Sequence, residues 1–322
     1  MISPRSQFIE LIVQGAIPAE KVADALKVAK ITPDGEEWRR FVDRLLLWIG
    51  GLALAFAVMF FIAYNWYNFG RLVKFAMVEG VIIMSIVAYL RFGGQSASGK
   101  VSILFATICL GVLLALYGQT YQTGADPWQL FFSWALLMLP WAVVGRFSAI
   151  WIVWVALINT AIVLYYQTFR GIFWFVSGSE TGMLWLTFIF NTLLLAVWEF
   201  LSGIWQWLSE RWAIRLLAIG SGVPLTWLVL LSILTPKGGP LPGPAWVIWL
   251  ALMYFIYRKK RPDLFMLAGC CLSVITVTVS FLGWHMLKSN SASAFFILTV
   301  LISAMGAGAA FWLKNVHKEF TS

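Results

Sequence analysis

About ten apolar stretches follow one another along the 322 residues of this chain, separated by short polar joints. A helix needs about 20 predominantly apolar residues to cross a hydrocarbon core of about 30 Å. Hydrophobic residues make up 61% of the chain and charged residues 11%, which is too apolar for a water-soluble domain. The sequence therefore predicts an all-α, polytopic integral membrane helical bundle of about ten transmembrane helices, embedded in a lipid bilayer. The predicted spans are 45–66, 72–90, 101–119, 129–145, 148–167, 183–201, 213–234, 244–257, 264–282 and 294–313.

The chain divides into a small polar head and two membrane halves. Residues 1–43 predict a cytoplasmic helical head, 44–167 a first half with spans one to five, and 168–322 a second half with spans six to ten. The two short helices expected in the head, over 6–14 and 19–30, cannot bury a core alone. We therefore expect residues 1–43 to dock on the inner loops or on a membrane-protein partner.

Orientation follows from the basic residues. With the N-terminus inside, 18 of the 23 Lys and Arg fall on the inward side of the predicted spans. Positively charged loops stay in the cytoplasm, so both termini are expected there. The net charge of +9 comes from these inward loops, and we expect no nucleic-acid partner.

Few residues suggest reaction chemistry. The three Cys all lie inside apolar spans and show no metal-ligand spacing, and the two His flank late spans and are too few for a His-based metal site. The segment from Gly94 to Val101 nearly matches a phosphate-binding loop, but Val101 replaces the magnesium-binding Ser or Thr and no strand precedes it. We expect no catalytic residue, no metal and no cofactor, and hence no enzyme.

Glu79 stands about 12 Å into the second span at 1.5 Å per residue. Because a carboxylate at that depth is costly, it should face the bundle interior, pair with a cation or be protonated. It is a candidate proton or cation relay, or else a buried structural acceptor. Lys74 is a poor partner, since five residues turn a helix by about 140°, and we expect it to extend toward the membrane surface.

The seventh span contains residues that weaken a helix: Gly220, Ser221, Gly222 and Pro224. Interrupted spans at matching positions of two halves mark substrate sites in transporters with inverted repeats. The alternative is a helix bent at proline whose small residues serve packing. The sequence supports either a broken-helix site or this packing motif.

A third candidate is the polar loop before the fourth span, on the outer side. Asp126 and Pro127 suit the N-cap and first turn of that span. The remaining polar residues could bind a ligand of unknown identity, or hold the loop against the end of the first span; they are Gln119, Tyr121, Gln122 and Thr123.

Two further polar groups are expected to be structural. Asn159 and Asn191 lie within spans five and six, where hydrogen bonds between helices are the usual role of an amide. A second set gathers near the inner face and is expected to form an interfacial charge network: Glu199, Glu210, Arg211 and Arg215.

The first half of the chain resembles a known family. The blocks WRRFVDRLLLWIGGLALAFAVMFFIAYNW, GRLVKFAMVEG and LYGQTYQTGADPWQLFFSWALLMLPWAVV are similar to the bacterial predicted membrane proteins called domain of unknown function 2157. The resemblance covers roughly residues 8–165, and AYNW and GQTYQTGADPW are its most specific parts. It implies a bacterial inner-membrane location and no particular activity.

The sequence is compatible with two functions. The first is a non-enzymatic membrane scaffold or envelope component, which uses the head and the outer loop as two contact faces. The alternative is a secondary transporter of a small solute or lipid, which uses Glu79 and a broken seventh span. An intramembrane enzyme has the least support, because a lone deep carboxylate makes a poor catalytic set.

Overall fold

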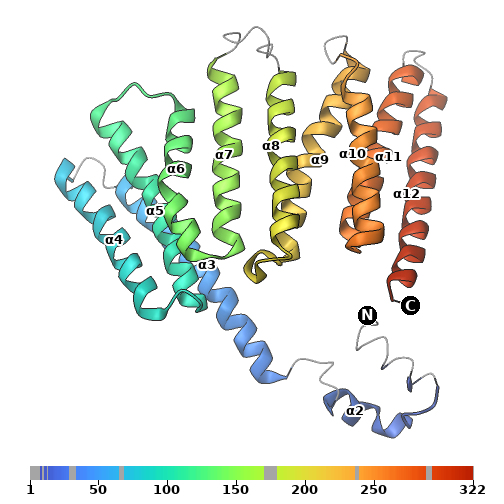
Figure 1. Ribbon diagram of the computed structural model, residues 1–322, viewed down its shortest axis with the longest axis horizontal. Helices are drawn as coiled ribbons and strands as arrows, with labels where there is room; N and C mark the ends of the chain where they lie inside the picture. The colour runs from blue at the N-terminus through green and yellow to red at the C-terminus, as the bar shows by residue number, and fades with distance from the viewer. Residues whose placement is uncertain are drawn as a thin grey trace. The chain divides into compact units, whose positions relative to one another are not determined.

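The computed structural model describes residues 8, 11–12, 14–28, 34–64, 69–169, 180–235, 239–287 and 292–321. All regular elements within these ranges are helical (Figure 1). A short 3-10 turn, Ala19–Lys21, leads into α2 (Val22–Val28), in the head. The other α-helices are α3 (Gly35–Tyr64), α4 (Arg71–Phe92), α5 (Ala97–Tyr121), α6 (Pro127–Gly145), α7 (Ser148–Thr168), α8 (Glu180–Leu201), α9 (Arg211–Leu234), α10 (Pro242–Phe255), α11 (Leu264–Leu287) and α12 (Ala292–Thr321).

The predicted polytopic bundle is confirmed. Nine of the described helices are long and apolar enough to cross a membrane, and they cover every predicted span except the eighth. That span corresponds to α10, which has 14 residues and continues directly into a π-helical turn, Ile256–Lys260. The predicted head helix over 6–14 lies mostly outside the described residues.

The chain forms two compact units. Unit 1 comprises residues 1–125, 136–145 and 320–322, and unit 2 comprises 126–135 and 146–319. The division differs from the halves 44–167 and 168–322 suggested by the sequence, because α7 groups with α8 and α9 in unit 2.

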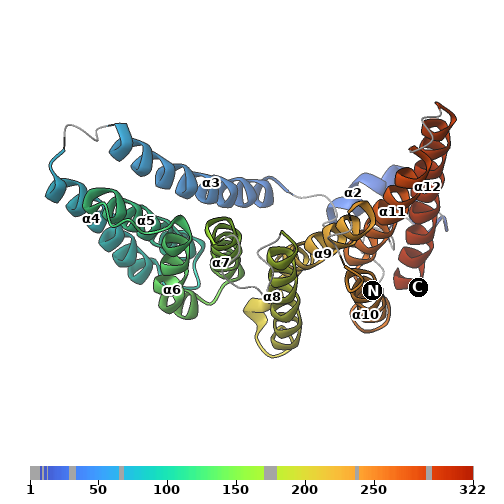
Figure 2. The ribbon, with the colours of Figure 1, turned by 90° about the horizontal axis from the view of Figure 1, so that it is seen from above.

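Unit 1 is organised around α5. Helix α4 packs along α5, and Val78 and Ile82 of α4 join Phe105 and Cys109 of α5 in its core. Helix α3 lies beside α5 and leaves most of its own surface uncovered (Figure 2). The two helices approach closely at Gly51, where an added Cβ would stand 2.5 Å from Val101 Cγ1.

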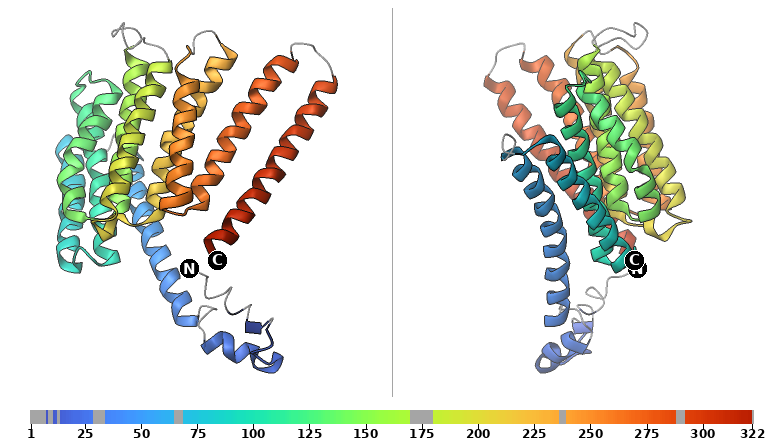
Figure 3. Two further views of the ribbon diagram at one scale, coloured as in Figure 1. Left: turned by 45° about the vertical axis from the view of Figure 1, so that its right-hand side comes forward. Right: turned by 90° about the vertical axis from the view of Figure 1, so that its left-hand side faces the viewer.

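Unit 2 is organised around α9. Helix α9 packs along α8, α10 and α11, and α8 also packs against α7. The inward face of α9 carries fully buried Leu217, Leu225 and Leu228. Helix α12 runs alongside α11 (Figure 3), and its Trp312 stacks on Tyr254 of α10 with ring centroids 6.3 Å apart.

Candidate functional site

A cluster of charged side chains lies at one end of unit 2. Two carboxylates, Glu199 at the end of α8 and Asp263 before α11, lie among three guanidinium groups, those of Arg211, Arg215 and Arg261. Asp263 is 4% exposed. We call these five residues, together with Tyr257, the charge cluster. It carries one more positive than negative charge.

Each carboxylate of the charge cluster accepts several hydrogen bonds. Asp263 accepts from Arg215 Nε and Nη2, both at 3.2 Å, and pairs with Arg211 Nη2 at 3.2 Å. Its Oδ1 also accepts from the backbone N–H of Phe265 at 3.0 Å, so Asp263 caps α11. These bonds compensate for the desolvation of a buried charge.

Glu199 is bound by three side chains from two other segments, α9 and the π-helical turn with the residue that follows it. Arg211 Nη1 donates to Oε1 at 3.2 Å, Tyr257 Oη donates to the same oxygen at 2.8 Å, and Arg261 pairs with Oε2. The expected charge network of Glu199, Arg211 and Arg215 is thus present. Glu210 lies outside it and accepts from Trp212 Nε1 at 2.9 Å.

Sequence reasoning missed Tyr257, Arg261 and Asp263 as members of this cluster. The segment that holds Arg261 and Asp263 reads as a basic loop, and its single acid follows a proline directly before an apolar run. That position is a helix N-cap signal, which could have identified Asp263. Tyr257 offers no such signal, because its partner Glu199 is 58 residues away.

A series of uncharged polar contacts, here called the polar ladder, crosses the middle of unit 2. Asn159 of α7 and Asn191 of α8 exchange two hydrogen bonds, at 3.2 and 2.7 Å, which confirms the expected contact between helices. Ser221 of α9 bonds Thr192 Oγ1 at 2.6 Å and accepts from Trp249 Nε1 at 2.9 Å. Thr226 of α9 bonds Ser273 of α11 at 2.7 Å.

The seventh span is not broken. Helix α9 is continuous from Arg211 to Leu234 with Pro224 inside it, so the chain is not interrupted at these residues. An added Cβ at Gly220 would lie 2.9 Å from Asn191 Oδ1, and one at Gly222 would lie 2.8 Å from the Trp249 ring. These glycines let α8 and α10 approach α9, while Ser221 and Pro224 are buried.

Glu79 is exposed on α4 and does not face the interior of unit 1, which was the first of the three arrangements expected for it. The buried stripe of α4 is Lys74, Val78, Ile82 and Ser85, at helical spacing. Glu79 is one residue, about 100°, beyond Val78 and therefore points away from α5. Lys74, expected to extend outward, is 6% exposed because it shares the inward stripe.

The polar loop before α6 is exposed. Tyr121 packs on Tyr117, with ring centroids 4.9 Å apart, and faces Phe75 of α4 at 6.1 Å. Gln122 ends α5 in the left-handed conformation, at φ 46°, and Gln119 and Thr123 are exposed. The proposed contact with AYNW involves residues 65–66, which lie outside the described residues.

Asp126 occupies the predicted position directly before α6. The backbone N–H of Gln129, which a capping carboxylate would bind, donates instead to the Asp126 carbonyl at 3.0 Å. No hydrogen bond joins the Asp126 carboxylate to a residue in the described part of the chain. The expected side-chain cap is therefore absent there.

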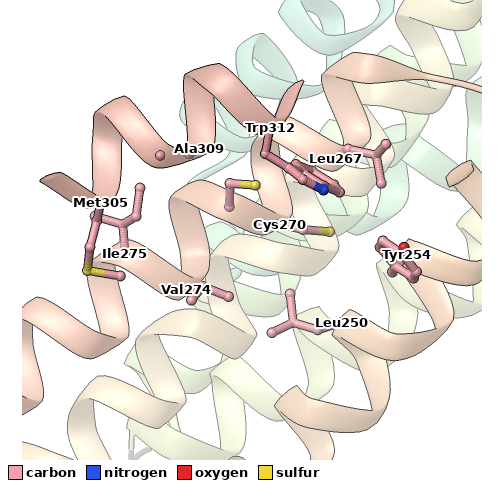
Figure 4. A pocket seen from close by; sticks show the side chains of 11 residues that line it. Leu250, Tyr254, Leu267, Cys270, Val274, Ile275, Met305, Ala309 and Trp312 are labelled. Carbon is pink, nitrogen blue, oxygen red and sulfur yellow. The ribbon is translucent and has the colours of Figure 1, made fainter. Parts of the chain in front are cut away.

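Two apolar cavities lie along the helices of unit 2. The smaller, about 360 Å³, lies between α10, α11 and α12 and is lined by carbon and sulfur side chains such as Cys270, Met305 and Trp312 (Figure 4). The larger, about 590 Å³, is a groove between α9 and α11 that Trp249 and Met253 of α10 also line. Here it is called the α9–α11 groove.

One of the comparisons with known proteins, the family match, agrees with this membrane architecture. No curated protein and no solved structure shows a significant match to the chain. The expected family resemblance is confirmed over slightly fewer residues than the sequence suggested. Residues 10–151 match the family described as "Predicted membrane protein (DUF2157)".

Proposed function

We propose that this multi-pass membrane protein is a non-enzymatic scaffold that binds another membrane protein through the uncovered surface of unit 1. The observation that carries the proposal is the exposure of Glu79 on α4. Its neighbours on the same face, one helical turn away on either side, are Ala76 and Ile83, and Ile83 is 60% exposed. The carboxylate thus stands on an apolar face that no part of unit 1 covers.

Membrane physics gives this exposure a consequence. An ionised carboxylate facing lipid at the centre of a span costs about 2.5–3.5 kcal/mol on insertion scales. A neighbouring helix that supplies a hydrogen-bond donor or a cation at that depth would remove most of this cost. The face around Glu79 is therefore a contact surface for a transmembrane helix with such a donor.

Helix α3 also has a largely exposed surface, which begins before the predicted first span. Ala55 is the only buried residue among the described side chains of α3. Its first turns carry charges of both signs beside exposed Trp38 and Phe41, at 54% and 57%. Large exposed aromatic side chains are enriched at protein interfaces, so this segment supports the expected partner contact through residues 1–43.

The transporter alternative rested on two features, a buried Glu79 and an interrupted seventh span. Glu79 is exposed and α9 is continuous. These two observations favour the scaffold.

Site-specific photocrosslinking in native membranes tests the proposal. A photoreactive residue at Ile83 should form one defined adduct, and Glu79→Lys should abolish it. Ile302 of α12, which is 47% exposed on a different helix, is the matched control and should form no defined adduct. Equal crosslinking at both positions, or an adduct at Ile83 that survives Glu79→Lys, would contradict the proposal. A proton-coupled flux in liposomes that Glu79→Gln abolishes would instead support the transporter.

A further inference from the structure

The lining of the α9–α11 groove is apolar, although three residues with hydroxyl groups contribute to it. Thr226 Oγ1 donates to the Gly222 carbonyl at 2.7 Å and bonds Ser273 Oγ at 2.7 Å, and Thr276 Oγ1 donates to the Leu272 carbonyl at 2.8 Å. Each hydroxyl is therefore already hydrogen-bonded within the protein. The groove offers a ligand apolar contact in place of hydrogen bonds.

The length of the groove matches one leaflet of a bilayer. Its α9 wall extends from Ala218 to Leu230 and its α11 wall from Phe265 to Thr276. Eleven or twelve residues of helix rise about 16–18 Å, and half of a hydrocarbon core of about 30 Å is about 15 Å. An acyl chain that lies parallel to the helices therefore fits this length.

One end of the groove meets the charge cluster. Phe265 lines the groove, and the Arg215 guanidinium lies over its ring at 5.3 Å from the centroid. Arg215 is also one helical turn before Ile219, another lining residue of α9. Its side chain is 41% exposed. A positive charge accessible from outside thus stands where the apolar groove ends.

The charge cluster has guanidinium N–H groups that are still free to donate, whereas both of its carboxylates are already paired with guanidinium groups. Each guanidinium has five N–H groups, whereas Arg215 directs two N–H bonds to Asp263. The two carboxylates are each bound by two guanidinium groups and leave one positive charge in excess. Exposed Lys259 and Lys260, next to Arg261, add two more cations nearby in sequence. An anion with several acceptor oxygens complements this end of the groove.

Tryptophan side chains gather at the same end. The rings of Trp205 and Trp207 stack between α8 and α9 with centroids 5.8 Å apart, and Trp212 is the second residue of α9. Tryptophan is enriched at the boundary between hydrocarbon and headgroups. Arg215, one turn into α9, is thus placed next to a phosphate layer.

We propose that the α9–α11 groove and Arg215 together bind an anionic phospholipid. One acyl chain occupies the groove, and the headgroup phosphate accepts hydrogen bonds from Arg215 at its end. The site favours a lipid over a free phosphate or a free hydrocarbon chain, because the groove binds the acyl chain and Arg215, at the end of the groove, binds the phosphate of the same molecule. A zwitterionic lipid of the same chain length gains the apolar contact but has lower electrostatic complementarity to the cluster.

Binding of spin-labelled phosphatidylglycerol to the purified, detergent-solubilised protein tests the assignment, with phosphatidylcholine of identical chains as the comparison. The parent should bind phosphatidylglycerol about fivefold more tightly or better, as expected for about 1 kcal/mol per basic residue near anionic lipid. Arg215→Gln should remove this preference, whereas Arg91→Gln, an exposed arginine of α4, should leave it intact. Equal affinity for the two lipids in the parent, or a preference that survives Arg215→Gln, would overturn the proposal.

The acyl-chain half of the site has its own test. Gly269 lines the groove, and an added Cβ there meets nothing within 4 Å, so Gly269→Leu fills the groove without a clash at Cβ. It should weaken binding of both lipids, and Gly306→Leu on α12, also in open space, should not. Unchanged binding in Gly269→Leu refutes the chain site. Displacement of the labelled lipid by glycerol phosphate alone would show a free-phosphate site and refute a lipid site.

Discussion

Asp263 offers the sharpest test of the charge cluster, because replacing it changes an ion network and a helix cap together. Asp263→Ala removes the hydrogen bond to the Phe265 N–H at 3.0 Å, which is a loss of about 1 kcal/mol for an N-cap. It also leaves Arg211 and Arg215 without this carboxylate. Breaking a fully buried pair costs about 3–5 kcal/mol, but Arg215 is 41% exposed and Arg211 still has Glu199.

We therefore expect Asp263→Ala to lower the free energy of unfolding by about 2–3 kcal/mol in total. Asp263→Asn should cost about 1 kcal/mol less, since its amide oxygen can still cap α11. Reversible denaturation by SDS in mixed micelles measures both values. The control is Glu319→Ala, which removes a carboxylate that is 62% exposed and paired with Arg258, and its effect should be small. A loss of unfolding free energy in Asp263→Ala no larger than that in Glu319→Ala would contradict the role of Asp263 in the ion network. An equal loss in Asp263→Asn and Asp263→Ala would contradict its role as the cap of α11.

Three further results are expected. Gly220→Ala and Gly222→Ala should each destabilise unit 2, because their new methyl groups meet Asn191 and Trp249 within 3 Å, whereas Gly306→Ala should be neutral or stabilising in the same denaturation assay. Asn191→Leu should cost about 1–2 kcal/mol by removing both hydrogen bonds between Asn159 and α8, which leaves the Asn159 side-chain oxygen without its donor, and replacing both amides by Leu should restore much of this loss. Reporter fusions in the α4–α5 joint should read cytoplasmic and those in the α5–α6 joint external; the reverse pattern would overturn the predicted orientation.

The sequence was sufficient to locate the helices because span length and apolarity are local properties. Each predicted span coincides with a described helix. The short eighth span corresponds to α10, the shortest of the ten helices that match predicted spans, with a π-helical turn at its end. The asparagine pair was also predictable. A carbonyl of its own helix can accept one amide N–H, as Val155 and Thr187 do here, but the amide oxygen needs a donor, which a neighbouring helix can supply.

The faces of the helices were much harder to predict. In a soluble helix the polar residues mark the outer face, but α4 is apolar on all sides, so hydropathy alone did not show that Glu79 lies outside and Lys74 inside. Gly220, Gly222 and Pro224 suggested a break in the seventh span because their effect on a helix also depends on its surroundings. Such residues weaken helices in water, whereas within a membrane bundle they are tolerated and allow close packing.

The two units satisfy their intramembrane polar groups in different ways, and the difference bears on function. In unit 2, Asn159, Asn191, Ser221 and Ser273 find partners on neighbouring helices of the same chain. That arrangement specifies how α7 to α11 pack. In unit 1, Glu79 lies on the uncovered face of α4. Because an exposed carboxylate at that depth raises the free energy of the isolated unit, a partner that supplies a donor to Glu79 gains affinity from relieving it. The same residue that destabilises the unit alone therefore favours its assembly, which is the behaviour expected of a scaffold and not of a self-contained proton relay.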